Sequence, residues 1–211
     1  TPAGEEEAAD PARQAQVIPP PSRDTLTVGL LAGGRATRLG GLDKAWLLRD
    51  GVPQVHRLRD RFASHASHVL VSANHELPRY AAAHIDAIPD RHPDTGPLSG
   101  LDALAAAATT PWLFTLPVDA LHVDASVLAR LIDAAGDTGA SAEDDDGLQP
   151  LVALWPVAAL RLAAAAALTG DDFSVRGLQR ALGMRTVRFA QVRFGNLNTP
   201  DDLVRAGVTH D

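Results

Sequence analysis

The chain has 211 residues, a hydrophobic fraction of 45% and a formal net charge of -7, values that fit a globular protein with one core. The negative charge argues against a nucleic-acid partner, because nucleic-acid binders usually display a basic face to the backbone phosphates. With 0 cysteines and no apolar stretch long enough to cross a bilayer, we expect a cytoplasmic protein without a disulfide framework or a membrane partner.

The N-terminal stretch 1–24 has the composition of a flexible leader. It combines an acidic run (Glu5–Glu7), several alanines and three prolines (Pro19–Pro21), which cannot pack a core. From Thr25 the character changes, and the apolar run Leu26–Leu31 stops at Gly33-Gly34 as a buried strand would. We therefore predict a leader over residues 1–24 and a single domain over residues 25–211.

Strand-like and helical patterns alternate along this domain. Further strands are predicted at 68–72, 85–89, 112–116, 151–155 and 186–189, and apolar residues recur at helical spacing in 55–62, 101–108 and 127–135. This alternation predicts an α/β fold, a three-layer α/β/α sandwich with a mostly parallel, Rossmann-like sheet. Ligands of such sheets bind at the carboxyl ends of the strands, where Gly33-Gly34, Asn74, Asp90 and Asp119 are expected to lie.

A glycine-rich segment follows the first predicted strand, from Leu31 to Lys44. Its four glycines allow close approach of the backbone to a ligand, and Arg35, Arg38 and Lys44 add positive charge, so the segment suits a triphosphate. It is neither a Walker A loop nor a Gly-x-Gly-x-x-Gly fingerprint. A glycine-rich surface turn with solvated arginines is the alternative.

This segment resembles the signature of nucleotidyltransferases with a glycosyltransferase-A-like fold. The doubled glycine before Leu42-Asp43-Lys44 is most similar to the molybdenum cofactor guanylyltransferase family, and the resemblance extends from about Leu26 to the C-terminus. It implies transfer of GMP from GTP to molybdopterin, with Mg²⁺ as cofactor, pyrophosphate as the second product and molybdoenzyme maturation proteins as further partners. A related transferase using CTP or a sugar phosphate, and a non-catalytic nucleotide-binding relative, remain the alternatives.

Two further segments carry the resemblance. Ile88-Pro89-Asp90 and Gly96–Gly100 resemble the family's acidic strand end and its Gly-Pro-Leu-x-Gly turn, and Gly96-Pro97 is also an ordinary helix start. Leu113–Asp119 resembles the metal-binding Pro-x-Asp, with Asp119 as the Mg²⁺ ligand or, alternatively, a helix cap. The sequence departs from the family here, because Ala120-Leu121 replaces the common Thr-Pro and Val118 a frequent cysteine.

The resemblance assigns roles on the nucleotide side. It implies that Lys44, Arg38 and Asp119 are catalytic, with Asp119 holding the metal. The nucleotide-binding set that it implies is Leu31, Ala32, Gly33, Gly34, Lys44, Asn74, Asp90 and Asp119. Asn74 taken alone is more often a turn residue than a ligand.

Two C-terminal segments resemble the family's acceptor side. They contain Gln149 and Pro150, and Asn196 and Asn198, which we expect to bind the acceptor through uncharged polar groups. Thr199-Pro200 is at the same time a plain capping sequence. The acidic run Glu143–Asp146 is interpreted as a solvated loop, and the 8 scattered histidines do not indicate a zinc site.

Overall fold

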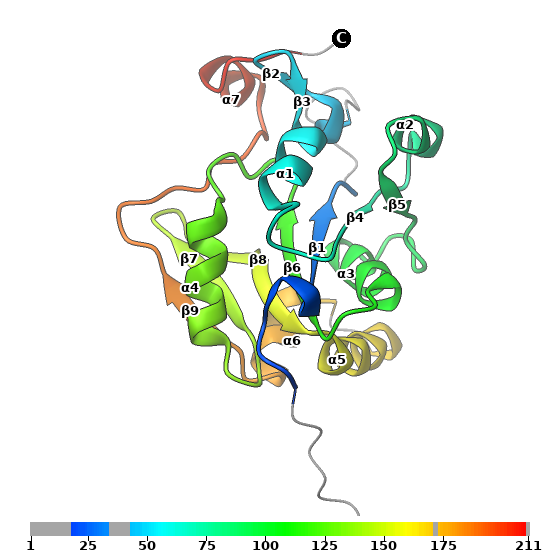
Figure 1. Cartoon of the computed structure of the whole chain (residues 1–211), viewed down its shortest axis with the longest axis vertical. Helices are drawn as coiled ribbons and strands as arrows, with labels where there is room; N and C mark the ends of the chain where they lie inside the picture. The colour runs from blue at the N-terminus through cyan, green and yellow to red at the C-terminus, as the bar shows by residue number, and fades with distance from the viewer. Residues whose placement is uncertain (1–17, 34–42, 171–172, 210–211) are drawn as a thin grey trace, which may run out of the picture.

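A seven-stranded sheet forms the centre of the molecule, in the order β5-β4-β1-β6-β8-β7-β9 (Figure 1). The computed structural model describes residues 18–33, 43–170 and 173–209. Only β8 runs antiparallel to its neighbours β6 and β7, so the predicted mostly parallel α/β sheet is confirmed. The strands are β1 (Leu26–Leu31), β4 (His68–Ser72), β5 (Asp86–Ile88), β6 (Trp112–Pro117), β7 (Ala140–Asp144), β8 (Gly147–Pro156) and β9 (Arg185–Arg188).

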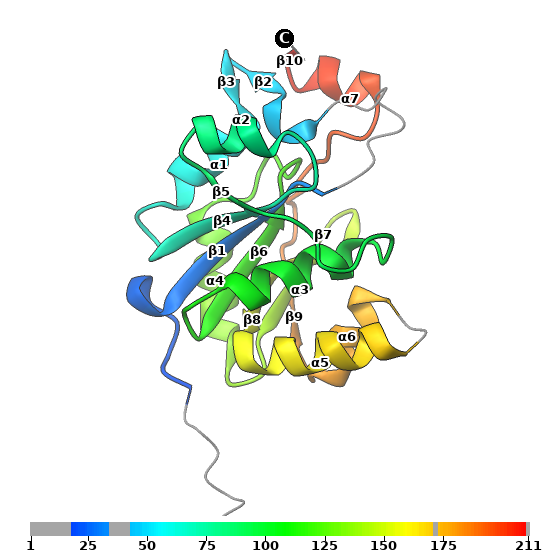
Figure 2. The ribbon, with the colours of Figure 1, turned by 90° about the vertical axis from the view of Figure 1, so that its right-hand side faces the viewer.

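Helices cover both faces of this sheet, as Figure 2 shows. One face packs against α1 (Gln54–Phe62) and α4 (Ala125–Ala135), and the other against α3 (Pro97–Ala107), α5 (Val157–Thr169) and α6 (Val175–Ala181). Strand β1 serves both cores because side chains alternate along a strand: Leu26, Val28 and Leu30 face the first set of helices and Leu31 faces the second. Among the described residues, no helix is long and apolar enough to span a membrane.

A second, small sheet lies beyond the carboxyl ends of the parallel strands. It pairs β10 (Val208–Thr209), β2 (Leu48–Arg49) and β3 (Val52–Pro53), with α7 (Pro200–Arg205) beside it (Figures 1 and 2). Leu47, Leu197 and Val208 form a separate buried cluster beneath it. The C-terminal segment is thereby fixed next to η4 (Lys44–Trp46), the short 3₁₀ turn that follows the glycine-rich segment. A short helix, α2 (Leu77–Ala82), joins β4 to β5.

The acidic run 143–146 does not form the solvated loop that its composition suggested. Glu143 and Asp144 belong to β7, and Asp144 is 1% exposed. Only Asp145 and Asp146 form the exposed turn of the β7–β8 hairpin. Composition could not predict this burial, because one of the hydrogen-bond donors to the Asp144 carboxylate is the backbone N–H of Phe194, 50 residues away in the sequence.

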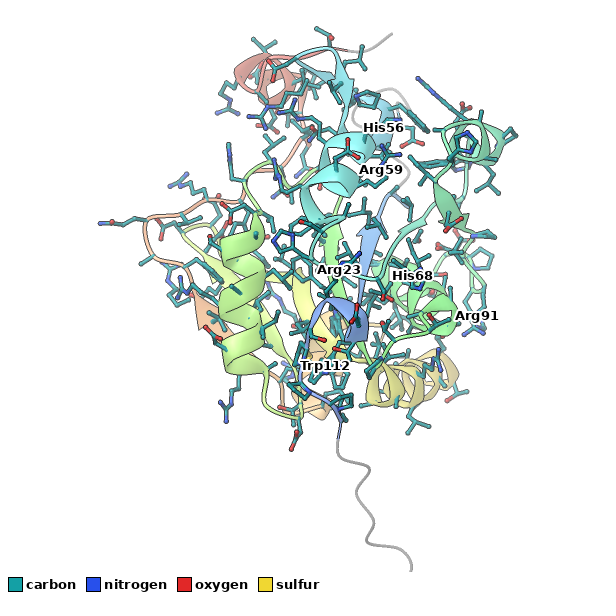
Figure 3. All side chains as sticks on the ribbon, in the orientation of Figure 1. Arg23, His56, Arg59, His68, Arg91 and Trp112 are labelled. Atoms are coloured by element: carbon teal, nitrogen blue, oxygen red, sulfur yellow. The ribbon has the colours of Figure 1, made fainter. Side chains whose placement is uncertain are left out.

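The described end of the predicted leader, residues 18–24, contacts the domain. Ile18 packs against the core, and the buried Trp112 indole donates a hydrogen bond of 2.7 Å to the Pro19 carbonyl. Residues Arg23–Thr25 form a 3₁₀ turn, η2, that leads into β1. Figure 3 places Trp112 close to this turn. We therefore expect that only residues 1–17 can be removed without loss of stability.

Two truncations test this boundary. Deleting residues 1–17 should leave the free energy of unfolding unchanged, because that stretch lacks the apolar side chains for stable docking. Deleting residues 1–24 should cost about 1–3 kcal/mol, because the Trp112 indole loses its acceptor and Ile18 its burial. Urea denaturation of the two proteins measures the difference, and equal midpoints would show that the contacts of Ile18 and Pro19 contribute nothing.

A glycine in α3 sets the distance between this helix and the sheet. A Cβ built on Gly100 would lie 2.8 Å from both Leu31 Cδ2 and Ser72 Oγ. Gly100→Ala should therefore lower stability by about 1–3 kcal/mol, because α3 must shift away from β1 and β4. Gly170→Ala is the matched control, since its nearest atom would lie at 3.6 Å. Comparison of the melting temperatures tests the expectation, which fails if the two variants are equally stable.

Candidate active site

An open cavity of about 190 Å³ lies at the carboxyl ends of the central parallel strands. The backbone continues the sheet at this edge, because Ala32 N–H donates to the Ser72 carbonyl and Val118 N–H to the Leu31 carbonyl. The cavity is lined by Leu31, Ala32, Gly33, Lys44, Ser72, Asp90, Gly96, Pro97, Gly100, Pro117, Val118, Asp119 and Leu151. These residues come from five parts of the sequence, namely 31–44, 72, 90–100, 117–119 and 151. They meet at the edge of the sheet where the strands end, as the sequence predicted.

One side of the cavity is a hydrogen-bonded polar cluster. Asp90 accepts from Ser72 Oγ at 3.1 Å and from Asn74 Nδ2 at 2.8 Å, while its own backbone N–H donates to Asn74 Oδ1 at 2.9 Å. A Cβ on Gly33 would lie within 4 Å of all three side chains, so the Gly33 backbone faces the cluster. Sequence reasoning missed Ser72, although its position at the end of β4 is a signal that could have revealed it.

The opposite side holds a lysine between two oxygen acceptors. Lys44 Nζ lies 2.6 Å from Asp119 Oδ2 and 2.7 Å from Asn198 Oδ1, and the Lys44 and Asp119 side chains are only 20% and 12% exposed. Asp119 follows β6, Lys44 begins η4 and Asn198 precedes α7. The residue predicted for the metal, the residue predicted for the phosphates and a residue predicted for the acceptor therefore meet at one point.

Buried neighbours fix the backbone of Lys44. The Asp43 carboxylate caps η4 by accepting from Ala45 N–H at 2.9 Å, and Tyr80 OH donates to its other oxygen at 3.3 Å. Tyr80 packs on the Trp46 ring with 4.9 Å between centroids. Burial raises the pKa of Asp43 and, in the same way, the pKa of Tyr80. Sequence reasoning assigned no role to Asp43 or Tyr80, yet Asp43 stands in the glycine-rich motif itself.

Lys44 is the only lysine of the chain, in which Lys and Arg together number 19. All other strong cations are arginines, whose planar guanidinium groups differ from a compact ammonium group. An ammonium group donates in any direction and fits between two acceptors at 2.6 and 2.7 Å. The geometry of the two contacts therefore suits a lysine at this position.

The loop between β5 and α3 supplies the rim of the cavity. Gly96 adopts a φ of 63°, and Pro97 occupies the first turn of α3, which confirms the predicted helix start. Gly96 and Pro97 at the start of α3 line the cavity, and the Ser99 N–H donates to the Gly96 carbonyl at 3.2 Å. Arg91 makes a two-point contact with the buried Asp102 of α3, at 2.9 and 2.7 Å, which ties the loop to the helix.

None of the four predicted acceptor residues lines this cavity, although Asn198 contacts Lys44, which does. Gln149 Nε2 donates to Asp144 Oδ1 at 2.9 Å, and the Pro150 carbonyl accepts from Gln179 Nε2 at 2.8 Å. Their neighbour on β8, Leu151, lines the cavity. Asn196 is exposed on the segment that leads to Asn198.

Two of the capping alternatives are decided. Helix α4 is capped by Asp124, whose Oδ1 accepts from Ser126 N–H at 2.9 Å, so the idea that Asp119 caps the following helix is wrong. Thr199 does cap α7 in a reciprocal capping box with Asp202, as predicted. Two residues predicted on the nucleotide side, Gly34 and Arg38, lie outside the described residues.

The carboxylates of the site suit a metal ion that is coordinated jointly by the protein and a ligand better than one that is coordinated by the protein alone. In residues 18–33, 43–170 and 173–209, no three Asp, Glu or His side chains gather as ligands. Of the two carboxylates that line the cavity, Asp90 is hydrogen-bonded to Ser72 and Asn74, and Asp119 is paired with Lys44. Mg²⁺ commonly takes one or two carboxylates and completes its shell with water and substrate phosphates. Asp119 therefore suits a metal ion that arrives with a phosphate-bearing ligand.

Comparison with known proteins agrees with this geometry. The chain is 37% identical over 181 residues to a molybdenum cofactor guanylyltransferase of Cereibacter sphaeroides, covering 84% of this chain and 93% of that protein. A protein of the same name from Pseudomonas aeruginosa is 36% identical over 180 residues, covering 82% and 90%.

Solved structures share the fold at low identity. Molybdopterin-guanine dinucleotide biosynthesis protein A of Archaeoglobus fulgidus has a TM-score of 0.66 at 21% identity, covering 85% of this chain and 96% of that one. A 2-C-methyl-D-erythritol 4-phosphate cytidylyltransferase of Thermus thermophilus has a TM-score of 0.62 at 19% identity, covering 84% and 95%. The model of the MobA-like NTP transferase domain matches residues 28–188. The chain belongs to this family and is a nucleotidyltransferase.

Proposed function

We propose that this chain transfers GMP from GTP to molybdopterin in a Mg²⁺-dependent reaction that releases pyrophosphate. The observation that carries the proposal is the meeting of Lys44, Asp119 and Asn198 beside the Gly33 backbone. Guanine and molybdopterin come from the names of the curated relatives, which are 32–37% identical over most of the chain. The site geometry supports the transfer of a nucleotide and does not by itself select the base.

The nucleotide would lie between the glycine-rich segment and α3. We assign the phosphates to the backbone of Gly33 and Gly34 and to Lys44 and Arg38, because amide hydrogens and cations offset the charge of a triphosphate. Asn74 and Asp90 would hold the nucleoside, together with the backbone of Leu31 and Ala32. Asn74 and Asp90 are already held by each other at 2.8 and 2.9 Å, so little ordering is needed on binding.

Asp119 and Lys44 would exchange partners when the nucleotide binds. Mg²⁺, when bound, would neutralise the phosphate oxygens and orient the leaving pyrophosphate. Asp119 would hold it through the carboxylate that now accepts from Lys44. Lys44 would then turn its ammonium group from Asp119 towards the phosphates, which preserves charge balance in a site that is only partly exposed.

The acceptor would approach from the side of Asn198. We assign Gln149, Pro150, Asn196 and Asn198 to molybdopterin. An oxygen of the acceptor phosphate attacks the α-phosphorus of GTP, a new P–O bond forms, and the bond from the α-phosphorus to the bridging oxygen of the β-phosphate breaks. No protein nucleophile is needed, so the side chains act by holding two anions in line.

A panel of nucleotides tests the assignment of the substrate. Pyrophosphate release is measured with GTP, CTP or UTP, each with molybdopterin and Mg²⁺, and turnover is expected with GTP. Turnover with CTP alone would replace the guanylyltransferase assignment by a cytidylyltransferase. Binding of GTP without any pyrophosphate release would instead support a non-catalytic relative.

Asp119→Asn tests the metal ligand. The variant keeps size and hydrogen bonding but removes the charge, so turnover should fall by about 10² or more if metal positioning supplies about 3 kcal/mol. Asp124→Asn is the matched control, because asparagine caps a helix as well as aspartate does and Asp124 caps α4 away from the cavity. Pyrophosphate release across a Mg²⁺ titration is the measurement. Parental turnover and metal dependence in Asp119→Asn would remove Asp119 from the metal site.

Two variants test the need for a lysine at position 44. Lys44→Ala should reduce turnover far more than stability, and Lys44→Arg should also reduce it, by about tenfold, because a guanidinium group cannot place one nitrogen between the same two acceptors.

The single lysine also gives a direct signal of its own. Protein made with isotope-labelled lysine has one lysine side chain, so one NMR signal reports the state of Lys44. Addition of GTP and Mg²⁺ should shift this signal as the ammonium group changes partners. An unshifted signal at saturating nucleotide, or equal turnover of Lys44→Arg and the parent, would contradict the proposed role.

A further inference from the structure

A buried carboxylate lies behind the acceptor side of the site and has no role in the proposed chemistry. Asp144, at the end of β7, is 1% exposed. Its Oδ1 accepts from Asp146 N–H and from Gln149 Nε2, each at 2.9 Å, and its Oδ2 accepts from Phe194 N–H at 2.8 Å. A buried carboxylate is costly unless donors surround it, so these three N–H groups define a single favourable arrangement.

Two of these donors belong to the segments assigned to the acceptor. Gln149 is itself an assigned residue, and Phe194 is followed within four positions by Asn196 and Asn198. Asp144 therefore holds one side chain of the β8 segment and the first backbone amide of the segment 194–198. Asp202 also accepts from this segment, at the Asn198 N–H, but among the described residues only Asp144 is hydrogen-bonded to both segments.

The backbone of Phe194 also connects the segment 194–198 to the loop that follows Asp119. Its carbonyl accepts from Leu121 N–H at 3.0 Å and from His122 N–H at 2.9 Å, both in the loop that follows Asp119. Beyond it, Leu197 is fully buried against Leu47 and Val208, and Asn198 contacts Lys44. The segment 194–198 is thus anchored by Asp144 at one end and meets Lys44 at the other.

We propose that Asp144 is a positioning residue that sets the acceptor-binding geometry of Gln149 and of the segment 194–198. The proposal rests on the proposed function for the identity of the acceptor. Asp144 acts through these residues and does not touch the reacting atoms. Loss of its charge should therefore weaken the acceptor complex more than it weakens nucleotide binding.

Asp144→Asn is the test variant. An asparagine offers one oxygen, and its NH₂ group would face a donor, so either the Phe194 contact or the two contacts on Oδ1 must break. The KM for molybdopterin should rise by about tenfold. The dissociation constant for GTP with Mg²⁺, measured by calorimetry, should change by a smaller factor than this KM, because Asn74, Asp90 and the Gly33 backbone are held by contacts that do not involve the segment 194–198.

The neighbouring Asp146→Asn is the matched control. Asp146 belongs to the same hairpin, is exposed, and its carboxylate pairs with Arg193 at 3.3 Å. Its removal should not change the KM for the acceptor. A double-mutant cycle supplies a second measurement. Asn196→Ala should raise the KM for the acceptor less in the Asp144→Asn protein than in the parent, because the segment 194–198 is already displaced in Asp144→Asn.

Hydrogen exchange separates this proposal from the proposed function. Without any substrate, amides of the segment 190–198 should exchange faster in Asp144→Asn than in Asp146→Asn. If Asp144→Asn fails to fold, replacing Phe194 by its α-hydroxy acid, which deletes only the N–H donor, is measured in the same way. Unchanged exchange, or an unchanged KM in an active enzyme, overturns the role of Asp144. A parent enzyme that is inactive with molybdopterin and GTP overturns the proposed function, while the exchange result still decides the role of Asp144.

Discussion

The ion pair between Lys44 and Asp119 is the contact on which the arrangement of the site depends. It joins the residue that ends the glycine-rich segment to the residue that follows β6, and Asn198 completes it from the C-terminal segment. Both charges are mostly shielded from water, so each needs a partner of opposite sign in every state of the site. This requirement limits where the two segments can lie. For the same reason, a ligand that binds to Lys44 or to Asp119 and breaks their ion pair must bring an opposite charge for the residue that is left.

The negative net charge of the chain does not oppose binding of an anionic ligand at this place. Charges more than about 8 Å apart in solvent are largely screened at physiological salt, so the local groups decide. Around the cavity these are Lys44, which is paired with Asp119, and the backbone of Gly33 and Gly96. Asp90 is turned towards Ser72 and Asn74, which occupy both of its oxygens. The acidic balance resides elsewhere, for example in the hairpin of Glu143–Asp146.

The sequence predicted the parts of the fold that depend on local patterns. Mostly apolar runs marked β1, β4 and β6, and parallel pairing then placed Gly33, Asn74 and Asp119 at one edge. The parts that it missed depend on distant partners. The Asp144 carboxylate of strand β7 needs the Phe194 N–H as a donor, and the two-residue strands of the small sheet are too short to leave a pattern. Ile18 docks next to Pro19, whose carbonyl accepts a hydrogen bond from the Trp112 indole. Hydrogen bonds between residues far apart in sequence leave no periodic signal to detect.

The loop that follows Asp119 links the two halves of the site through its backbone. A proline at position 121, as the family commonly has, would lack an N–H group, whereas Leu121 N–H donates to the Phe194 carbonyl at 3.0 Å. His122 N–H donates to the same oxygen at 2.9 Å, so the loop after Asp119 and the segment before Asn198 are held by two bonds. Ala120 is 1% exposed and Val123 fully buried, which shows that the altered loop packs well. The loop after Asp119 is therefore held to the segment before Asn198 through the Phe194 carbonyl, and one of the two bonds requires a residue with an N–H group at position 121.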